Sequence, residues 1–555
     1  MLITALQNPA LYDHPVERFE VVETHISWVL LTGPYAYKIK KPVDLGFLDF
    51  STLEKRRFFC GEELRLNRRL APDLYLDVVA IRGSAKVPRL GGEGPAIEYA
   101  VKMKQFPREG ELDRVLERGE LGTGHIDVLA REIAAFHGRV TVAGENTPFG
   151  TPERIAQPIR DNFKTIREQV SAKSPLPPFA KGGEQGAFDN GRTKSAGAEP
   201  PPFEKGGIGG NFLNRITHLE SWSEAAHAAL TDVFRERKRD GFIRECHGDL
   251  HLANIAWVNG RAVIFDCIEF SEGLRWIDVM SEAAFLTMDL DDRGAPKLSR
   301  RWLTGYLELT GDYAGLRVLR FYQVYRALVR AKVACIRIGQ AGGAGDRARF
   351  EREYRSYVDL AGRYTRPARP ALAMMHGLSG SGKTALAQAL VEAWGAVRVR
   401  SDVERKRLHG LAPDARTASG LDTGLYAPEA GERTYRRLAD LARTVIEAGH
   451  SVIVDAACLK RAQRAALREA AARSRTPFVI LDVRAPEAVL RARIAARARE
   501  GRDASDADLA ILDHQLAMAE PLGPDERPRV VAVDTDRPLD VKRLVAEINN
   551  KMTGP

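Results

Sequence analysis

The amino-acid sequence predicts two folding units of different classes, an α+β unit of two lobes followed by an α/β unit with a parallel sheet. The first observation is length, because 555 residues are too many for one hydrophobic core. The second is that residues 1–105 hold short strand-like runs, whereas residues 371–550 alternate apolar strands with helical segments. The third is a stretch rich in proline and arginine, residues 366–370, which lies between these two patterns and predicts a linker.

Composition narrows the class of protein. Basic and acidic residues alternate along the chain, so the formal net charge of +9 is not concentrated in a polybasic block. This mild basicity fits anionic small molecules, and nucleic acid is not the favoured partner. The five scattered cysteines include no C-x-x-C pair, which argues against a zinc site or a disulfide framework. With no signal-like start and no apolar run of about 18 residues, we expect a cytoplasmic protein without membrane contact.

The first unit, residues 1–365, begins with a strand-rich lobe of about residues 1–105. Runs of β-branched and aromatic residues predict strands at Phe19–Val22, Ile26–Thr32, Tyr35–Lys40, Val78–Ile81 and Glu98–Gln105. The segment Ser51–Leu70 is expected to form a helix that Ser51 caps. Helical spacing over Ile126–Arg139, over Leu219–Arg237 and on to about Tyr364 predicts a second, helical lobe.

Residues 175–210 differ from the rest of the first unit. They are rich in proline, glycine, serine and lysine, and the pattern Pro-Pro-Phe-x-Lys-Gly-Gly occurs twice, from Pro177 and from Pro201. Too few apolar groups are present to offset the entropy of ordering this segment. We expect a disordered insertion between two helices, and a binding loop is the alternative.

The second unit, residues 371–550, alternates apolar strands with helices. After a first strand at Ala371–His376, further strands are predicted at Val397–Arg400, Ser451–Asp455, Thr476–Val483 and Arg529–Val533. Alternation of this kind predicts a parallel sheet with helices on both faces.

The turn after the first of these strands matches G-x-x-x-x-G-K-T and leads into a predicted helix, Thr384–Trp394. Strand, glycine-rich turn and helix are the context in which this motif, the P-loop, surrounds the phosphates of a nucleotide. Lys383 would reach the β- and γ-phosphates, and the Thr384 hydroxyl would bind Mg²⁺. We therefore expect ATP and Mg²⁺ at a site formed by Gly377, Ser379, Gly380, Ser381, Gly382, Lys383 and Thr384.

Further candidates follow the later strands, because the carboxyl ends of parallel strands face the ligand. Asp402 follows the second strand and is the candidate catalytic base, with a helix cap as its alternative role. Asp455 ends the third strand, where a carboxylate can hold metal, and a turn residue is the alternative. Arg493 and Arg497 share one helix face and would close over the phosphates, unless that face is merely solvated.

A second constellation lies in the first unit, where His247-x-Asp249 is followed by Asn254 on the same predicted loop. In phosphoryl transfer such an Asp orients and deprotonates an acceptor hydroxyl, and the Asn binds metal. Asp266 follows a short predicted hairpin and would be the second metal ligand. The order of loop, hairpin and acid makes this pattern specific for an ATP-dependent site.

Two partners are expected upstream, a strand lysine and a helix glutamate that bind the nucleotide together. Lys38 is preferred over Lys40, and Glu63 is preferred over Glu62. The segment Met103–Phe106 would be the hinge whose backbone meets adenine.

Residues 371–550 resemble the small P-loop kinases of the gluconate kinase, shikimate kinase and polynucleotide kinase type. The Asp402…Arg405 spacing is similar to the Asp-x-x-Arg of polynucleotide 5′-kinases. The resemblance implies that Asp402 is the base and that Arg405 contacts the substrate. AAA-type machines are disfavoured, because the unit is short and its arginines resemble a lid.

Residues 1–365 resemble the aminoglycoside phosphotransferase family in His247, Asp249, Asn254 and Asp266, and in the later Arg275-x-x-Asp278. The resemblance implies a two-lobed, protein-kinase-like fold and phosphorylation of a small-molecule hydroxyl. One departure is that no G-x-G-x-x-G precedes Lys38, since residues 23–27 occupy that turn.

The function expected from both constellations is that of a bifunctional phosphotransferase, which passes the γ-phosphoryl of ATP to hydroxyls of small molecules. Two alternatives stay open. In the first, the second unit phosphorylates polynucleotide 5′-hydroxyls. In the second, the protein is an ATP-binding regulatory protein whose first unit is inactive.

Overall fold

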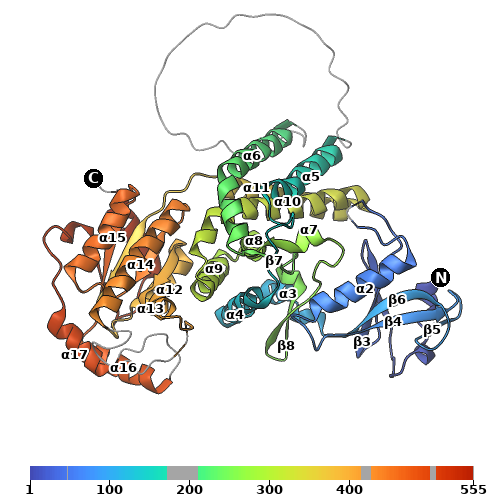
Figure 1. Ribbon diagram of the computed structural model, residues 1–555, viewed down its shortest axis with the longest axis horizontal. Coiled ribbons are helices and arrows are strands. Elements are labelled where there is room, and N and C mark those ends of the chain that lie inside the picture. Colours follow the sequence, from blue (N-terminus) through green and yellow to red (C-terminus); the bar gives the residue numbers. More distant parts are fainter. Residues whose placement is uncertain (47, 172–209, 414, 416–426, 501–507, 554–555) are drawn as a thin grey trace, which may run out of the picture.

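The computed structural model describes residues 1–46, 48–171, 210–413, 415, 427–500 and 508–553. In Figure 1 the molecule is elongated, with the strands of the first hundred residues at one end, a group of helices in the middle and a second sheet at the other end. We call residues 1–365 the N-terminal unit and residues 371–553 the P-loop unit. The insertion predicted at 175–210 lies outside the described residues, apart from Gly210.

The N-terminal unit begins with an antiparallel sheet of strand order β1-β2-β3-β6-β4-β5. The strands are β1 Glu20–Glu23, β2 Ser27–Leu31, β3 Tyr35–Lys40, β4 Tyr75–Gly83, β5 Pro88–Leu90 and β6 Ala96–Lys104. Short helices precede the sheet at α1 Leu2–Ala5 and η1 Pro9–Leu11. The third predicted strand agrees with β3 at both ends, whereas β5 was not predicted because three residues give no periodic signal.

Helix α2 (Leu53–Asn67) packs against β4 and β6 of this sheet. Its N-cap is Thr52, whose hydroxyl accepts a hydrogen bond from the backbone N–H of Lys55 at 3.3 Å. The prediction that Ser51 caps this helix was wrong. The Ser51 hydroxyl instead donates to Asp49 Oδ1 at 2.5 Å, so it is not available to the helix.

The middle of the molecule is helical. Its helices are η2 Arg108–Gly110, α3 Leu112–Glu117, α4 Thr123–Arg139, α5 Pro152–Ser171, α6 Gly210–Arg239, η3 Leu252–Asn254, α7 Glu272–Arg275, α8 Val279–Asp292, α9 Pro296–Thr310, η4 Tyr313–Gly315, α10 Leu316–Gln340 and α11 Ala344–Tyr364. Between them lie two small antiparallel pairs, β7 Ile243–Glu245 with β10 Trp276–Asp278, and β8 Ile255–Val258 with β9 Arg261–Ile264. The turn of the β8–β9 hairpin is Asn259-Gly260, both at positive φ, as a tight type I′ turn requires.

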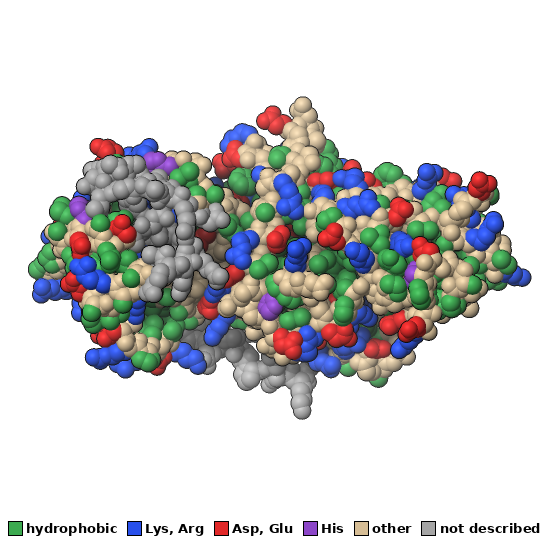
Figure 2. All heavy atoms as spheres, turned by 90° about the horizontal axis from the view of Figure 1, so that it is seen from below, with side chains coloured by type: hydrophobic (Ala, Val, Ile, Leu, Met, Phe, Trp, Pro, Cys, Tyr) green, Lys and Arg blue, Asp and Glu red, His purple; other side chains and the backbone are tan. Residues whose placement is uncertain are grey.

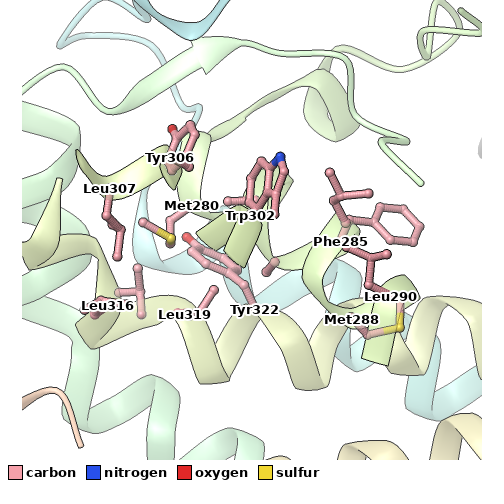
Figure 3. Close-up of a cluster of buried hydrophobic side chains, with 14 of the residues drawn as sticks. Met280, Phe285, Met288, Leu290, Trp302, Tyr306, Leu307, Leu316, Leu319 and Tyr322 are labelled. Atoms are coloured by element: carbon pink, nitrogen blue, oxygen red, sulfur yellow. The ribbon is translucent and has the colours of Figure 1, made fainter. Parts of the chain in front are cut away.

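Helices α8, α9 and α10 form the centre of this region. Every residue of α8 from Val279 to Leu290 is buried, which is the pattern of a helix with neighbours on all sides. Figure 3 shows how Phe285 and Met288 of α8 lie near Trp302 of α9 and Tyr322 of α10. These three helices therefore share one packed core.

The P-loop unit is built on a five-stranded sheet of order β12-β13-β11-β14-β15, in which all neighbours are parallel. The strands are β11 Leu372–His376, β12 Val397–Arg400, β13 Val452–Asp455, β14 Phe478–Arg484 and β15 Val530–Asp534. The helices are α12 Lys383–Trp394, α13 Ser401–Leu408, α14 Pro428–Glu447, α15 Arg461–Arg473, α16 Glu487–Glu500, α17 Leu509–Met518, η6 Arg527–Arg529 and α18 Val541–Thr553. The predicted parallel sheet is confirmed.

The two faces of this sheet belong to different hydrophobic cores. On one face, α12 and α18 pack over residues such as Ala373 and Val531. On the other face, α14 contributes Leu438 and Val445 to a buried cluster that continues into α8, α9 and α10 of the N-terminal unit. One core thus runs through both units.

Among the described residues, no helix has the length and apolar character needed to cross a bilayer.

Candidate phosphate and metal sites

The P-loop joins β11 to α12, and three of its glycines have positive φ values, 147° at Gly377, 80° at Gly380 and 88° at Gly382. These positions are also crowded. A Cβ on Gly377 would lie 2.4 Å from the carbonyl oxygen of Val483, and one on Gly380 would lie 2.7 Å from that of Leu490. Glycine is therefore required both for the backbone conformation and for the close approach of β14 and α16.

Lys383, the first residue of α12, folds back over this loop. Its Nζ donates to the carbonyl oxygens of Gly377 at 2.9 Å and Leu378 at 2.7 Å. Burial lowers the pKa of Lys383 to about 8, although the carboxylates of Asp455 and Asp402 act in the opposite direction. A phosphate at the helix N-terminus would give this buried cation a stronger partner than two carbonyl groups.

A cavity of about 420 Å³ opens beside the P-loop. Its lining includes residues at the ends of β12 and β13 and residues of α16 and α17. The predicted site residues that line it are Ser379, Gly380, Gly382, Lys383, Thr384, Asp402, Arg405, Asp455, Arg493 and Arg497. The structure therefore brings together residues that are more than 100 positions apart in the sequence.

Asp455 and Thr384 lie together at the base of this cavity. Asp455 is 5% exposed, and its Oδ2 has no hydrogen-bond partner among the residues that the structure describes. Burial raises the pKa of this carboxyl group, while the guanidinium of Arg400 and the hydroxyl of Thr384 act against that rise. The nearest cation to Asp455 Oδ2 is the Arg400 guanidinium, whose Nε lies 3.7 Å away, too far for a hydrogen bond. A buried carboxylate oxygen without a hydrogen bond, next to a threonine hydroxyl, fits the oxygen ligands that Mg²⁺ prefers.

Asp402 and Arg405 form an ion pair within the first turns of α13. Arg405 Nη1 donates to Asp402 Oδ1 at 2.8 Å, and the Asp402 side chain is 25% exposed. The N-cap of α13 is Arg400, so Asp402 lies inside the first turn and is not the cap residue. Its carboxylate is held beside the cavity and can accept a further hydrogen bond from a ligand hydroxyl.

The two arginines of α16 lie one turn apart, and both line the cavity. Arg493 is bound to the loop after β15. Its Nη1 donates to the Thr535 hydroxyl at 2.9 Å and its Nη2 to the Thr535 carbonyl at 2.7 Å. The Gln515 side chain accepts a hydrogen bond from the Ser379 backbone N–H at 2.8 Å.

Thr535 and Gln515 were not identified from the sequence. For Thr535 a signal existed, because it directly follows β15, and the carboxyl ends of parallel strands converge on the ligand edge. Gln515 carries no such signal, since a single polar residue on a helix does not indicate which element it will face.

The second candidate site lies between the N-terminal sheet and the β8–β9 hairpin. Lys38 Nζ lies 2.8 Å from Glu63 Oε1 and 2.5 Å from Asp266 Oδ1. Glu63 is fully buried, whereas 46% of the Asp266 side chain is exposed. Glu62 turns away and pairs with Arg65. The structure thus brings Lys38, Glu63 and Asp266 together from three separate segments.

Lys40 is 1% exposed and does not face solvent. Its Nζ donates to Glu63 Oε2 at 2.7 Å and also to Glu269. Burial is the largest influence on the Lys40 ammonium and lowers its pKa, but Glu269 and Glu63 outweigh it and keep the group charged. Lys40 is therefore part of the support behind Lys38 and cannot reach a bound phosphate.

Asp249 and Asn254 lie on one loop, as their spacing predicts. Asn254 Nδ2 donates to Asp249 Oδ2 at 2.9 Å, and His251 Nε2 lies 3.3 Å from the same oxygen. Burial by itself would raise the pKa of Asp249, but His251 and the Arg330 guanidinium hold it well below its usual range. Asp249 is therefore ionised at neutral pH.

Residues that the sequence did not single out hold this loop in place. Glu282 of α8 accepts from the Gly248 N–H at 2.6 Å, and Asp289, about two turns further along the same helix, accepts from the Leu252 N–H at 2.9 Å. Arg326 of α10 donates to the Gly248 carbonyl at 3.0 Å. These groups are buried charges with defined partners, a feature that burial reveals and sequence spacing does not.

Arg275 and Asp278 occupy structural positions near this site. Arg275 Nε donates to Glu245 Oε1 at 3.2 Å, and its Nη1 donates to the Glu269 carbonyl at 3.1 Å. Asp278 caps α8 and forms two hydrogen bonds with Arg237, at 2.7 and 2.8 Å. Both residues fix the segment that follows Asp266.

Comparison with known proteins relates the whole chain to curated sequences. "Uncharacterized protein Rv2004c" of Mycobacterium tuberculosis (strain ATCC 25618 / H37Rv) is 30% identical over 497 residues, which cover 89% of each chain. "Uncharacterized protein Mb2027c" of Mycobacterium bovis (strain ATCC BAA-935 / AF2122/97) matches to the same extent. The chain belongs to the family of these mycobacterial proteins. The aligned length exceeds either unit, so the family relationship extends across both.

A protein-family model described as "AAA domain" matches residues 372–522. This stretch begins at β11 and contains Lys383, Asp402, Asp455 and both lining arginines of α16. The match covers less than half of the chain and supports a P-loop domain over this stretch. Our expectation that AAA-type machines are disfavoured, which rests on the short length of the unit and its lid-like arginines, stays a prediction.

Two solved structures show a weaker likeness. A gluconokinase from Sinorhizobium meliloti 1021 is 25% identical, with a TM-score of 0.23, over 34% of this chain and 93% of its own. A choline/ethanolamine kinase family protein from Mesorhizobium loti is 11% identical, with a TM-score of 0.34, over 65% of this chain and 97% of its own.

Proposed function

We propose that the protein is a bifunctional ATP-dependent phosphotransferase, in which each unit transfers the γ-phosphoryl group of ATP to a hydroxyl of a small molecule. The observation that carries this proposal is the presence of two separate clusters of the same chemistry. Lys383 lies near Asp455 and Asp402, and Lys38 contacts Asp266 close to the loop of Asp249. Each cluster combines a partly buried lysine for phosphate with carboxylates for metal and for proton acceptance.

In the P-loop unit, the N-terminus of α12 and Lys383 would bind the phosphates, and Thr384 and Asp455 would hold Mg²⁺. Asp402 would orient the acceptor hydroxyl and accept its proton. Arg405 fixes the Asp402 carboxylate through their 2.8 Å contact and would also touch the acceptor. Arg497 of α16 also lines the cavity and would cover the phosphates.

In the N-terminal unit, Lys38 would bind phosphate and Glu63 would keep it in position. Asp266 and Asn254 would hold Mg²⁺ through their side-chain oxygens. Asp266 Oδ1 lies 2.5 Å from Lys38 Nζ, and the Asn254 amide lies beside Asp249, to whose Oδ2 its Nδ2 donates at 2.9 Å. Asp249 is ionised, so it can accept a hydrogen bond from the hydroxyl that attacks. At both sites the bound Mg²⁺ would neutralise phosphate charge and orient the phosphate oxygens.

One observation favours an alternative for the P-loop unit, the phosphorylation of polynucleotide 5′-hydroxyl ends, namely the Asp402–Arg405 contact itself. The distribution of charge on the surface argues against this alternative. On the face in Figure 2, basic and acidic side chains are interspersed, and no continuous basic stripe for a phosphate backbone is seen. Among the described residues that line the cavity, Tyr435 and His514 carry the aromatic rings, so a strand of several bases would find few side chains on which to stack.

A regulatory role for the N-terminal unit also has one observation in its favour. The turn between β1 and β2 is closed on itself, because the Thr24 N–H and hydroxyl both bond to the Ser27 carbonyl. A turn of this kind offers fewer backbone N–H groups to phosphates than a glycine-rich loop does. A protein that only senses nucleotide would keep its biological output in the Asp249→Asn variant.

The test is transfer from γ-labelled ATP to a panel of hydroxyl-bearing metabolites and to a 5′-hydroxyl oligonucleotide. We expect two separable activities, one lost in Lys383→Ala and the other in Asp249→Asn, each by roughly 100-fold or more. If wild-type protein transfers no phosphate and hydrolyses no ATP, the proposal fails. If the oligonucleotide is the preferred acceptor and its binding falls steeply with salt, the alternative is correct.

A further inference from the structure

The starting observation is a buried arginine on the edge strand of the P-loop sheet. Arg398 lies in β12 and is 7% exposed, although β12 has a sheet neighbour on one side only. The N-terminal unit covers the open side. Helix α9 packs against both β12 and α12, and the Tyr313 hydroxyl donates to the Arg398 carbonyl at 3.4 Å.

The charge of Arg398 is matched by a carboxylate from the N-terminal unit. Arg398 Nε donates to Glu308 Oε1 at 2.6 Å and Nη2 donates to Glu308 Oε2 at 3.2 Å. The remaining nitrogen, Nη1, points to the first turn of α12 and donates to the Thr384 carbonyl at 3.4 Å. Two hydrogen bonds thus connect Glu308 of α9, through Arg398, with Thr384, which we assign to Mg²⁺ binding.

The same guanidinium also lies near Asp455. Arg398 and Arg400 are two positions apart on β12 and pair with Ile453 and Asp455 of β13. Their side chains therefore lie on one face of the strand, and Arg400 Nε is 3.7 Å from Asp455 Oδ2. A cation that favours the carboxylate also competes with a metal ion for it, unless another anion balances its charge. Glu308 is that anion.

Helix α9 holds the opposite end of α12 as well. Arg300 Nη1 donates to the Glu392 carbonyl at 2.8 Å and the Ala393 carbonyl at 3.3 Å, which caps the last turn. Arg301 bridges Glu392 and Asp127, with both contacts at 2.7 Å. The N-terminal unit therefore contacts both ends of α12. Arg300 binds its last turn directly, and Glu308 acts on its first turn through Arg398.

We propose that Glu308 of the N-terminal unit is a positioning residue of the P-loop site. It holds Arg398 against the Thr384 carbonyl and balances its charge, so that the Asp455 carboxylate stays available to a divalent cation. The P-loop site is in this sense completed by the other unit. This inference rests on the proposed function for the identity of the site, and it assigns a role to a residue that lies outside the phosphate-binding motif.

The test measures binding of a fluorescent ADP analogue to full-length protein as a function of Mg²⁺ concentration. Binding that Lys383→Ala removes is assigned to the P-loop site. In Glu308→Gln, the unbalanced Arg398 should raise the Mg²⁺ concentration needed for half-maximal binding by about tenfold, the range in which outer-sphere partners change metal affinity. Thermal unfolding of each variant shows whether it is folded.

Two further variants separate this role from a purely structural one. Glu392→Gln breaks the Arg301 ion pair at the same interface but at the far end of α12, and it should leave the Mg²⁺ requirement unchanged. Glu308→Gln/Arg398→Gln removes both charges and should return the requirement toward that of the wild type.

The inference is overturned if Glu308→Gln binds like the wild type, if Glu392→Gln shifts the Mg²⁺ requirement equally, or if the double variant is no better than the single one. A folded wild type without Mg²⁺-dependent binding that Lys383→Ala removes would overturn the proposed function of this unit together with the inference. Because the readout is binding, failure to find an acceptor substrate does not affect the result.

Discussion

Two lysines of β3, only two positions apart, have different tasks. Lys38 contacts Asp266, whose side chain is half exposed, whereas Lys40 is enclosed between Glu63 and Glu269. Their sequence context is almost the same, and spacing alone does not decide between them. What distinguishes them is the position of Glu269, whose carbonyl accepts a hydrogen bond from Arg275 and whose side chain pairs with Lys40.

Replacing Lys40 by methionine should destabilise the protein strongly. Without the ammonium group, Glu63 and Glu269 face each other in a buried place, and breaking a buried ion pair costs about 3–5 kcal/mol. Burial already raises the pKa of Glu269, so this carboxyl group would take up a proton as the pH falls. The loss should therefore be greater at pH 7.5 than at pH 5.5.

Urea unfolding of Lys40→Met at the two pH values gives the measurement. The control is Lys40→Met/Glu269→Gln, which removes one of the two facing charges and should recover part of the stability. A loss below about 1 kcal/mol at pH 7.5, the value of an exposed ion pair, would show that Lys40 is not the buried partner described above.

At the scale of elements, β12 shows where prediction from sequence ends. Its bounds, Val397–Arg400, agree with the predicted strand, because the valines supply a clear strand signal. Alternating valine and arginine, however, indicates a strand with one solvated face. The structure instead buries Arg398, since α9 from the other unit supplies Glu308 as its partner. A partner that lies 90 residues away leaves no local trace in the sequence.

The same limit applies to the candidate sites. Lys383, Thr384 and Asp455 were identified because they belong to a motif or to a strand end, and both signals are local. The acids that hold the Asp249 loop, Glu282 and Asp289, lie on a helix that sequence spacing shows only as apolar. Their role depends on how α8 packs, which is a property of the tertiary fold.

The edge of β12 supports a prediction about Tyr313. Tyr313→Phe removes the hydroxyl that donates to the Arg398 carbonyl and leaves that buried acceptor without this partner. We expect a loss of about 1 kcal/mol in unfolding free energy and faster amide hydrogen exchange in β12. Tyr357→Phe, which removes a hydroxyl inside the N-terminal unit, is the control and should leave exchange in β12 unchanged. Equal exchange of β12 in both variants would contradict the assignment.

At the scale of the whole molecule, the two units share a hydrophobic core and an interface of buried charges. The cluster that includes Trp302 and Tyr322 also includes Leu438 and Val445 of α14 (Figure 3 shows the part in α8, α9 and α10). Helices α8 and α9 are consecutive, and they reach the Asp249 loop and the P-loop helix respectively. The molecule is therefore better described as two sites on one framework than as two independent enzymes joined by a linker.

A fragment of residues 366–555 tests this description. Separated from α9, it would expose the apolar face under α14 and leave Arg398 without Glu308. We expect it to aggregate, or to unfold at lower urea concentration than the same region in the full chain. Size-exclusion chromatography and hydrogen exchange of β12 and β13 give the readout. A monomeric fragment with the protection seen in the full-length protein would show that the units are independent.

The interface also predicts sensitivity to acid. His450 lies in the turn before β13, where burial, assisted by the Arg320 guanidinium, lowers its pKa to about 3. The unfolded chain binds the proton near pH 6.5 and the folded chain does not, so stability falls as the pH drops below 6.5. The slope from this residue is at most about 1.4 kcal/mol per pH unit.

Comparing the wild type with His450→Gln isolates this contribution, because other acid-sensitive groups are common to both proteins. Urea unfolding between pH 7.5 and pH 5 should show curves that converge as the pH falls, with the glutamine variant losing less stability. Parallel curves over this range would mean that His450 is protonated equally in the folded and unfolded states.

The Glu308–Arg398 contact has a consequence for how such a chain can evolve. Each residue lies in a different unit, and either one alone would be a buried charge without a counter-ion. A substitution at one position is therefore costly unless the other changes too, so we expect the two stretches of sequence to vary together. Replacing either unit by that of a distant homologue would separate Glu308 from Arg398. We therefore expect homologues with both units to keep a complementary pair of residues at these two positions.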